Sequence, residues 1–227
     1  MPDRRRKAVL AANAVLFLYT CLLMVFYEQE GSLWLKGMAA SGFLAIGLVN
    51  FFYALGAENK RRFFPFFMVL GLGVCLGGDI LLNIHFAAGV VLFTLGHVLY
   101  CVAYCAMKKP KPIDLLPGIC LFCLILLAAS CLSGLRFPSV SMRQLCVIYA
   151  SIISLMAGKA ISNFCRERNA VTFILMAGSI LFLASDAMLG IRQFCYWPKI
   201  PHIVSLSAYF FAQCLLGHSL FWVKEQK

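Results

Sequence analysis

Apolar residues occur along this chain in eight long runs that are separated by short polar segments. The runs span Ala8–Tyr27, Leu33–Leu55, Phe64–Asn83, Ala87–Met107, Ile113–Leu132, Met142–Asn163, Ala170–Ile191 and Ile200–Val223. Each is close to the ~20 residues that a helix needs to cross a bilayer. Membrane β-barrels show alternating segments of roughly ten residues instead. The pattern predicts an all-α membrane protein of eight transmembrane helices, with residues 1–227 in one polytopic domain.

The composition agrees with this prediction. Of the 227 residues, 62% are hydrophobic and only 13% are charged. Soluble domains are about 45–50% apolar and about 25% charged. These values exclude a soluble globular domain and a disordered chain. We therefore expect a multi-pass protein of the cell membrane or an endomembrane.

The basic residues predict an orientation. Fourteen of the twenty Lys and Arg fall at the two chain ends or in the loops after the second, fourth and sixth runs. They are Arg4, Arg5, Arg6, Lys7, Lys60, Arg61, Arg62, Lys108, Lys109, Lys111, Arg166, Arg168, Lys224 and Lys227. The positive-inside rule then places both termini in the cytoplasm. Most of the net charge of +11 thus comes from basic residues that set the orientation of the helices and attract anionic lipid headgroups. We therefore expect the lipid bilayer as partner and no nucleic acid.

No sequence pattern indicates a cofactor or a metal. The four His are scattered rather than set at metal-ligand spacing, and the eleven Cys lie almost entirely within apolar runs. Cysteines in such runs behave as small apolar side chains. We expect no bound metal and no cofactor.

Two acidic residues, Asp79 and Asp186, are assigned to the interior of the predicted spans. Placing a carboxylate in a span costs ~2.5–3.5 kcal/mol on insertion scales, so such residues are functional candidates. Both lie near the outer ends of their runs, in similar surroundings: Gly78-Asp79-Ile80-Leu81-Leu82 and Ser185-Asp186-Ala187-Met188-Leu189. We interpret the two Asp as the centre of a site in the outer half of the membrane.

The spacing of the two Asp suggests an internal repeat. Positions 79 and 186 are 107 apart, and the same offset relates Lys36 to Arg143. A basic residue thus precedes an acidic one by the same distance in each half. This predicts a tandem repeat of two four-helix halves in one orientation, with Asp79 and Asp186 facing each other across a cavity open to the outer side.

Other polar side chains fall in the same outer half or near the middle of the spans. They are Asn83, His97, Tyr100, Tyr149, Ser185, Tyr209 and Gln213. His97 and Tyr100 share a helix face, as do Tyr209 and Gln213, because residues three or four apart are neighbours on a helix. In the inner half, Lys159 is interpreted as a residue that snorkels to the cytoplasmic interface.

The order and spacing of several of these residues resemble the YhhN family of integral-membrane lysoplasmalogenases. The resemblance rests on Gly78-Asp79-Ile80-Leu81-Leu82, Gly96-His97-Val98-Leu99-Tyr100, Tyr149, Ser185-Asp186, and Tyr209 with Gln213. Two positions depart from the family pattern: Gly37 stands where a Pro is expected, and Arg192 where a polar residue such as Asn is expected.

The resemblance implies an ether-bond hydrolase that splits the vinyl-ether bond of a lysoplasmalogen into a fatty aldehyde and a glycerophospho-base. A lysophospholipid is then the expected substrate, and Asp79 and Asp186 the catalytic acid and base. In this reading Lys36 and Arg143 hold the phosphate. The remaining substrate-binding residues are Asn83, His97, Tyr100, Tyr149, Ser185, Tyr209 and Gln213.

Two alternatives stay open at this point. Paired carboxyl groups in a repeated membrane fold also describe a small proton-coupled transporter of a lipid or metabolite. A metal-dependent hydrolase of another lipid bond is the second alternative. The sequence predicts neither the oligomeric state nor which Asp is the acid.

Overall fold

The structure is a computed structural model that describes residues 2–55, 62–132, 134–196 and 200–225. Eight α-helices make up almost all of these residues, together with one short 3-10 helix. They are α1 (Pro2–Glu30), α2 (Leu33–Leu55), α3 (Phe63–Ile84), α4 (Phe86–Met107), η1 (Pro112–Asp114), α5 (Leu115–Cys131), α6 (Val140–Arg166), α7 (Ala170–Phe194) and α8 (His202–Glu225). All eight spans, with η1 joined to α5, are long and apolar enough to cross a membrane. The prediction of an all-α, multi-pass membrane protein is confirmed.

Most helix ends lie within a few residues of the predicted runs, and local capping explains several of them. The side chains of His85, Ser139 and Asn169 accept hydrogen bonds from backbone N–H groups in the first turns of α4, α6 and α7. Such caps satisfy donors that a helix start leaves without partners. Helices α1 and α6 extend beyond their apolar runs at both ends.

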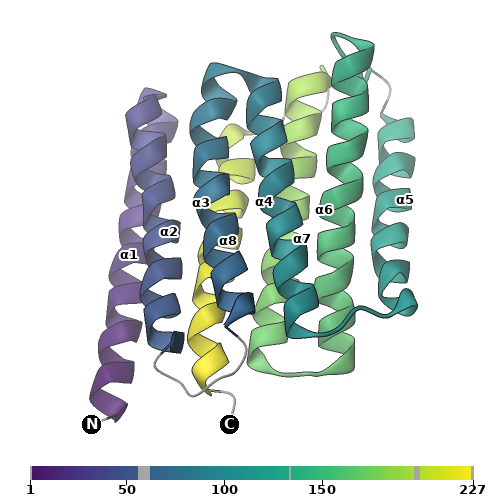
Figure 1. Cartoon of the computed structure of the whole chain (residues 1–227). Helices are drawn as coiled ribbons and strands as arrows, with labels where there is room; N and C mark the ends of the chain where they lie inside the picture. Colours follow the sequence, from purple (N-terminus) through teal and green to yellow (C-terminus); the bar gives the residue numbers. More distant parts are fainter. Residues whose placement is uncertain (1, 56–61, 133, 197–199, 226–227) are drawn as a thin grey trace.

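Sequential helices run antiparallel, and α1 begins at the same end of the bundle at which α8 ends (Figure 1). A chain that crosses an even number of times in alternating directions has both of its ends on the same side. The membrane side of that end stays a prediction, and Lys60, Arg61, Lys199 and Lys227 lie outside the described residues.

The packing partners form two matching sets. Within each half, α1 packs on α2, α2 on α3 and α3 on α4, as α5 does on α6, α6 on α7 and α7 on α8. The halves meet mainly through α2 with α8 and through α4 with α6, and exchanging each helix for the one four places later turns one of these contacts into the other. The smaller contacts of α8 with α1 and with α3 have no counterpart of similar size. A tandem repeat would have this pattern, and the repeat itself stays a prediction.

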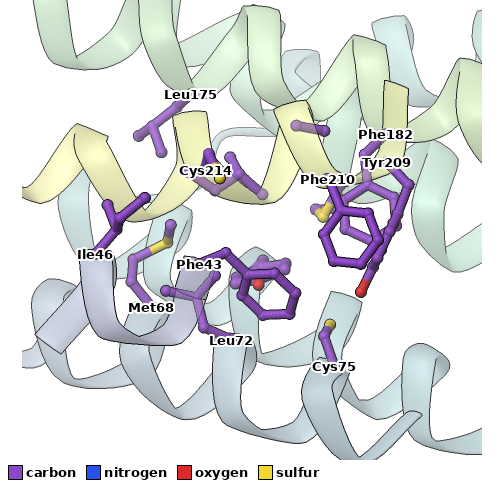
Figure 2. Packing of buried hydrophobic residues seen from close by; sticks show 14 of the residues in the cluster. Phe43, Ile46, Met68, Leu72, Cys75, Leu175, Phe182, Tyr209, Phe210 and Cys214 are labelled. Atoms are coloured by element: carbon purple, nitrogen blue, oxygen red, sulfur yellow. The ribbon is translucent and has the colours of Figure 1, made fainter. Parts of the chain in front are cut away.

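The hydrophobic core is one cluster to which α1, α2, α3, α4, α6, α7 and α8 contribute buried side chains, and Figure 2 shows the part between α2, α3, α7 and α8. Its side chains include Phe43, Ile46, Met68, Leu72, Cys75, Leu175, Phe182, Phe210 and Cys214. Tyr209 of α8 belongs to this core, and its ring is packed against Phe43 and Phe210. The core therefore holds a polar hydroxyl group at a defined position.

Glycines allow α5 to approach α6 closely. A Cβ atom placed on Gly158 would lie 2.2 Å from the backbone nitrogen of Gly118. Small residues at such crossings are a common means of helix association in membranes. This contact holds the first turn of α5 against α6.

We expect Gly158→Ala to lower the stability of the detergent-solubilised protein by about 1–3 kcal/mol, because the new methyl group overlaps the backbone of α5. Gly73→Ala is the matched control, since nothing lies within 4 Å of its added Cβ. The control should be neutral or stabilising by up to ~1 kcal/mol through helix propensity. Thermal unfolding measures both, and a Gly158→Ala variant as stable as the wild type would contradict the close crossing.

A buried ionic cluster occupies the end of α5 and α6 nearest the chain termini. Asp114 accepts hydrogen bonds from Lys159 Nζ at 2.5 Å, from Ser162 Oγ at 2.5 Å and from Arg166 Nη1 at 3.0 Å. The assignment of only two acids to the spans is therefore wrong. The snorkelling interpretation of Lys159 is also wrong: its side chain is buried, since a carboxylate partner within the bundle makes contact with water unnecessary.

Candidate active site

A cavity of about 460 Å³ opens among the helix ends opposite the termini. All eight helices contribute to its wall, through residues such as Tyr27, Lys36, Asp79, Val90, Ile125, Tyr149, Asp186 and Tyr209. Its size is in the usual range for small-molecule sites, which are mostly apolar with a few placed polar groups. Asp79 and Asp186 both line it, as the sequence predicts.

Asp79 of α3 is almost completely buried and has two charged or polar partners. Its Oδ2 atom accepts a hydrogen bond from the Tyr209 hydroxyl at 2.5 Å, and its Oδ1 atom lies 3.5 Å from Lys36 Nζ. Gln213 Nε2 in turn donates to the Tyr209 oxygen at 3.2 Å, while Gln213 Oε1 accepts from Tyr100 at 2.8 Å. This chain of hydrogen bonds holds Tyr209 in place and orients the Asp79 carboxylate.

Asp186 of α7 has a different set of partners. It accepts a hydrogen bond from the Tyr149 hydroxyl. The His97 Nε2 atom lies 2.9 Å from the Tyr149 oxygen and 3.5 Å from Asp186 Oδ2. His97 is fully buried, whereas the Asp186 side chain keeps 11% of its exposure. Asp186 thus faces the open part of the cavity.

Aromatic rings separate the surroundings of the two carboxylates. The Phe182 ring centre lies 4.6 Å from that of His97 and 5.3 Å from that of Tyr209, both in edge-on contact. Phe93 packs against Tyr209 on another side, at 5.7 Å. These rings hold the polar groups rigidly and keep the local environment apolar, which strengthens electrostatic interactions within it.

The structure brings most of the predicted site residues to the cavity or into contact with its polar groups. They are Lys36, Asp79, Asn83, His97, Tyr100, Tyr149, Ser185, Asp186, Tyr209 and Gln213. Asn83 donates to the Asp79 carbonyl at 3.1 Å and accepts from Tyr27. Ser185 donates to the Ser205 carbonyl at 2.8 Å, which is a contact between helices. Arg143 is exposed and is not among the residues that line the cavity.

Sequence reasoning missed five polar residues of the cavity wall: Tyr27, Arg192, Gln193, His202 and Ser205. Arg192 was noticed only as a departure from a family pattern. His202 and Ser205 lie in the first turn of α8, where hydropathy carries no information on which way a side chain faces.

Within the described ranges, no group of three or more His, Cys, Asp or Glu is arranged to hold a metal ion. The absence of a metal and of a cofactor stays a prediction.

Comparisons with known proteins indicate the family of this chain. The chain is 24% identical over 140 residues to a bovine (Bos taurus) protein named "Lysoplasmalogenase TMEM86A". The aligned region covers 60% of this chain and 55% of the bovine protein, so the match spans about half the length of that relative. No solved structure matches the chain. Residues 34–220, which include every polar residue of the cavity except Tyr27, match the YhhN family. The chain therefore belongs to the YhhN family.

Proposed function

We propose that the protein hydrolyses the vinyl-ether bond of a lysoplasmalogen, giving a fatty aldehyde and a glycerophospho-base. One observation carries the proposal: two carboxyl groups line one cavity among apolar helices, and their surroundings differ in charge. Family membership and the name of the bovine relative support the same substrate class.

The charges favour one division of roles. Lys36 lies beside Asp79 and compensates a negative charge there. Asp186 has no Lys or Arg within ion-pair distance among the described residues; its neighbour is the His97 imidazole ring. A pair of carboxyl groups with contrasting environments supplies one proton donor and one anion. We assign Asp186 as the general acid and Asp79 as the anion.

The first step is protonation of carbon. Asp186 gives its proton to the vinyl carbon that is β to the ether oxygen. The double-bond electrons form the new C–H bond, and the carbon attached to oxygen becomes an oxocarbenium ion. The Asp79 carboxylate stabilises this cation, as one carboxylate does for the similar cation in glycoside hydrolysis.

The second step adds water and restores both carboxyl groups. Water attacks the oxocarbenium carbon and loses a proton to Asp79, which leaves a hemiacetal. The hemiacetal hydroxyl then gives its proton to Asp186 while Asp79 protonates the departing glycerol oxygen. The C–O bond breaks, the aldehyde is released, and Asp186 is again protonated and Asp79 ionised.

The apolar part of the wall suits the alkenyl chain. Leu82, Phe86 and Val90 face the cavity from α3 and α4, and Ile125 and Leu132 face it from α5 and the residue after it. An alkenyl group bound there is kept away from water, while the ether oxygen of the substrate can lie near the two Asp side chains.

We expect purified protein in detergent to release one aldehyde per lysoplasmalogen, without an ion gradient. In D₂O, the aldehyde should carry one deuterium on the carbon next to its carbonyl group, because the Asp186 proton exchanges with solvent and is delivered to that carbon. Mass spectrometry of the trapped aldehyde measures this label.

The matched control substrate is the 1-O-alkyl lysophospholipid, which has the same headgroup and no double bond and should stay intact. Headgroup release instead of aldehyde, or aldehyde without the deuterium, would contradict the mechanism. Transport that needs a gradient and yields no product would favour the carrier, and loss of activity with chelators would favour the metal-dependent hydrolase.

A further inference from the structure

A second polar group lies at the mouth of the cavity, beyond the two carboxylates. We propose that Arg192, with His202 and Ser205 beside it, binds the phosphate of the lysophospholipid. This inference rests on the proposed function, because it concerns how the same cavity holds its substrate.

Arg192 is placed to meet an anion within the cavity. It lies in the last turn of α7 and lines the cavity together with His202 and Ser205. Its Nη1 atom is 3.4 Å from the Ser205 hydroxyl oxygen. Ser205 comes from the first turn of α8. Two helices thus bring a guanidinium group, an imidazole ring and a hydroxyl group to one part of the wall.

Among the described residues, no carboxylate lies within ion-pair distance of Arg192. In the described part of the chain, the carboxylate ion pairs of Lys36, Lys159 and Arg166 are with Asp79 or Asp114, and Arg192 forms none. His202 is hydrogen-bonded to Glu28, so that acid already has a partner. A half-buried Arg with free donors in an apolar-lined cavity is suited to a phosphate, which its planar fork can bind in a bidentate manner.

The distance along α7 fits the proposed substrate. Arg192 follows Asp186 by six residues, which is about 9 Å along a helix axis. In a lysoplasmalogen, seven bonds separate the phosphorus from the carbon that takes the proton, and an extended chain advances roughly 1.2 Å per bond, or about 8 Å in total. A phosphate at Arg192 therefore places the reacting carbon at the depth of Asp186.

The alternative cation at the same end of the bundle is Arg143, which the 107-residue offset matches to Lys36. Arg143 is exposed in the first turns of α6 and does not line the cavity. The two arginines thus lie in spans of the same half of the chain and differ in access to the site. This makes Arg143 the matched control for Arg192.

The test measures binding without catalysis. Purified protein in detergent is titrated with a non-hydrolysable 1-O-alkyl lysophospholipid and with the corresponding 1-O-alkylglycerol, which lacks the phosphate. Arg192→Gln should weaken binding of the phosphate-bearing lipid by about tenfold or more, the loss expected for a hydrogen-bonded charged group. It should leave alkylglycerol binding unchanged. Arg143→Gln should change neither.

The outcomes separate this inference from the proposed function. Equal binding of the phosphate-bearing lipid by Arg192→Gln and wild type would overturn it, and so would an equal loss for both lipids. If Arg192→Gln lost binding of the phosphate-bearing lipid alone, this would support the phosphate site even if the wild type released no aldehyde from a lysoplasmalogen. Only the proposed function would then fail. If the wild type released aldehyde and Arg192→Gln bound the phosphate-bearing lipid as tightly as the wild type, the proposed function would stand and this inference would fail.

Discussion

Asp79→Asn and Asp186→Asn are each expected to reduce aldehyde release by at least about a hundredfold, the usual scale for loss of a general acid or base. An amide at position 186 has no proton to give to the vinyl carbon. An amide at position 79 neither stabilises the oxocarbenium ion nor takes a proton from water. Initial rates of aldehyde formation measure the loss, and thermal unfolding in detergent checks that each variant is folded.

Glu30→Gln is the matched control, because it removes an acid at the same end of the bundle from an exposed position outside the cavity. It should keep wild-type activity. The double variant of Asp79 and Asp186 should be little worse than either single one, since residues that act as a unit are not additive. Full activity in either single variant would refute the mechanism.

Asp114→Ala is expected to lower the stability of the protein by about 3–5 kcal/mol, because it leaves a buried charge without its partner. The stranded charge is that of Lys159, whose side chain is buried. Arg166 is less affected, since its side chain keeps 26% of its exposure. Thermal unfolding in detergent is the measurement.

A compensating change tests the cause of that loss. Adding Lys159→Met to Asp114→Ala removes the stranded charge and should recover part of the stability, since apolar replacement of a buried pair is often tolerated. The activity of the molecules that remain folded should be unchanged, because the cluster is at the far end of α6 from the cavity. A single variant as stable as the wild type would show that the cluster does not hold α5.

The spans and the central pair of acids could be predicted because both depend on local information. A continuous apolar run of about 20 residues has one stable arrangement in a bilayer. A carboxylate in such a run is costly wherever the helix packs. The eight helices therefore follow from the sequence alone, and Asp79 and Asp186 could be chosen as candidates before any packing was known.

Which of Arg143 and Arg192 lines the cavity depends on how the helices pack, so the sequence alone could not predict it. Lys36 and Arg143 have matching positions in sequence, but Tyr27 and Asp79 surround Lys36, whereas Arg143 is exposed. Each residue turns a helix by about 100°, so a small change in how a helix packs decides which side chain enters the cavity. Asp114 was overlooked because it lies at the edge of a run, where burial depends on the neighbouring helix.

The partners of the two carboxylates come from both halves of the chain. Asp79 is held by Lys36 from its own half and by Tyr209 from the other, and Asp186 by Tyr149 from its own half and by His97 from the other. A chain divided after α4 would give two four-helix fragments, each with one carboxylate and an incomplete set of partners. The proposed reactive centre thus forms only when the two halves pack together. Two separately made fragments would have to associate before either Asp had its full set of partners.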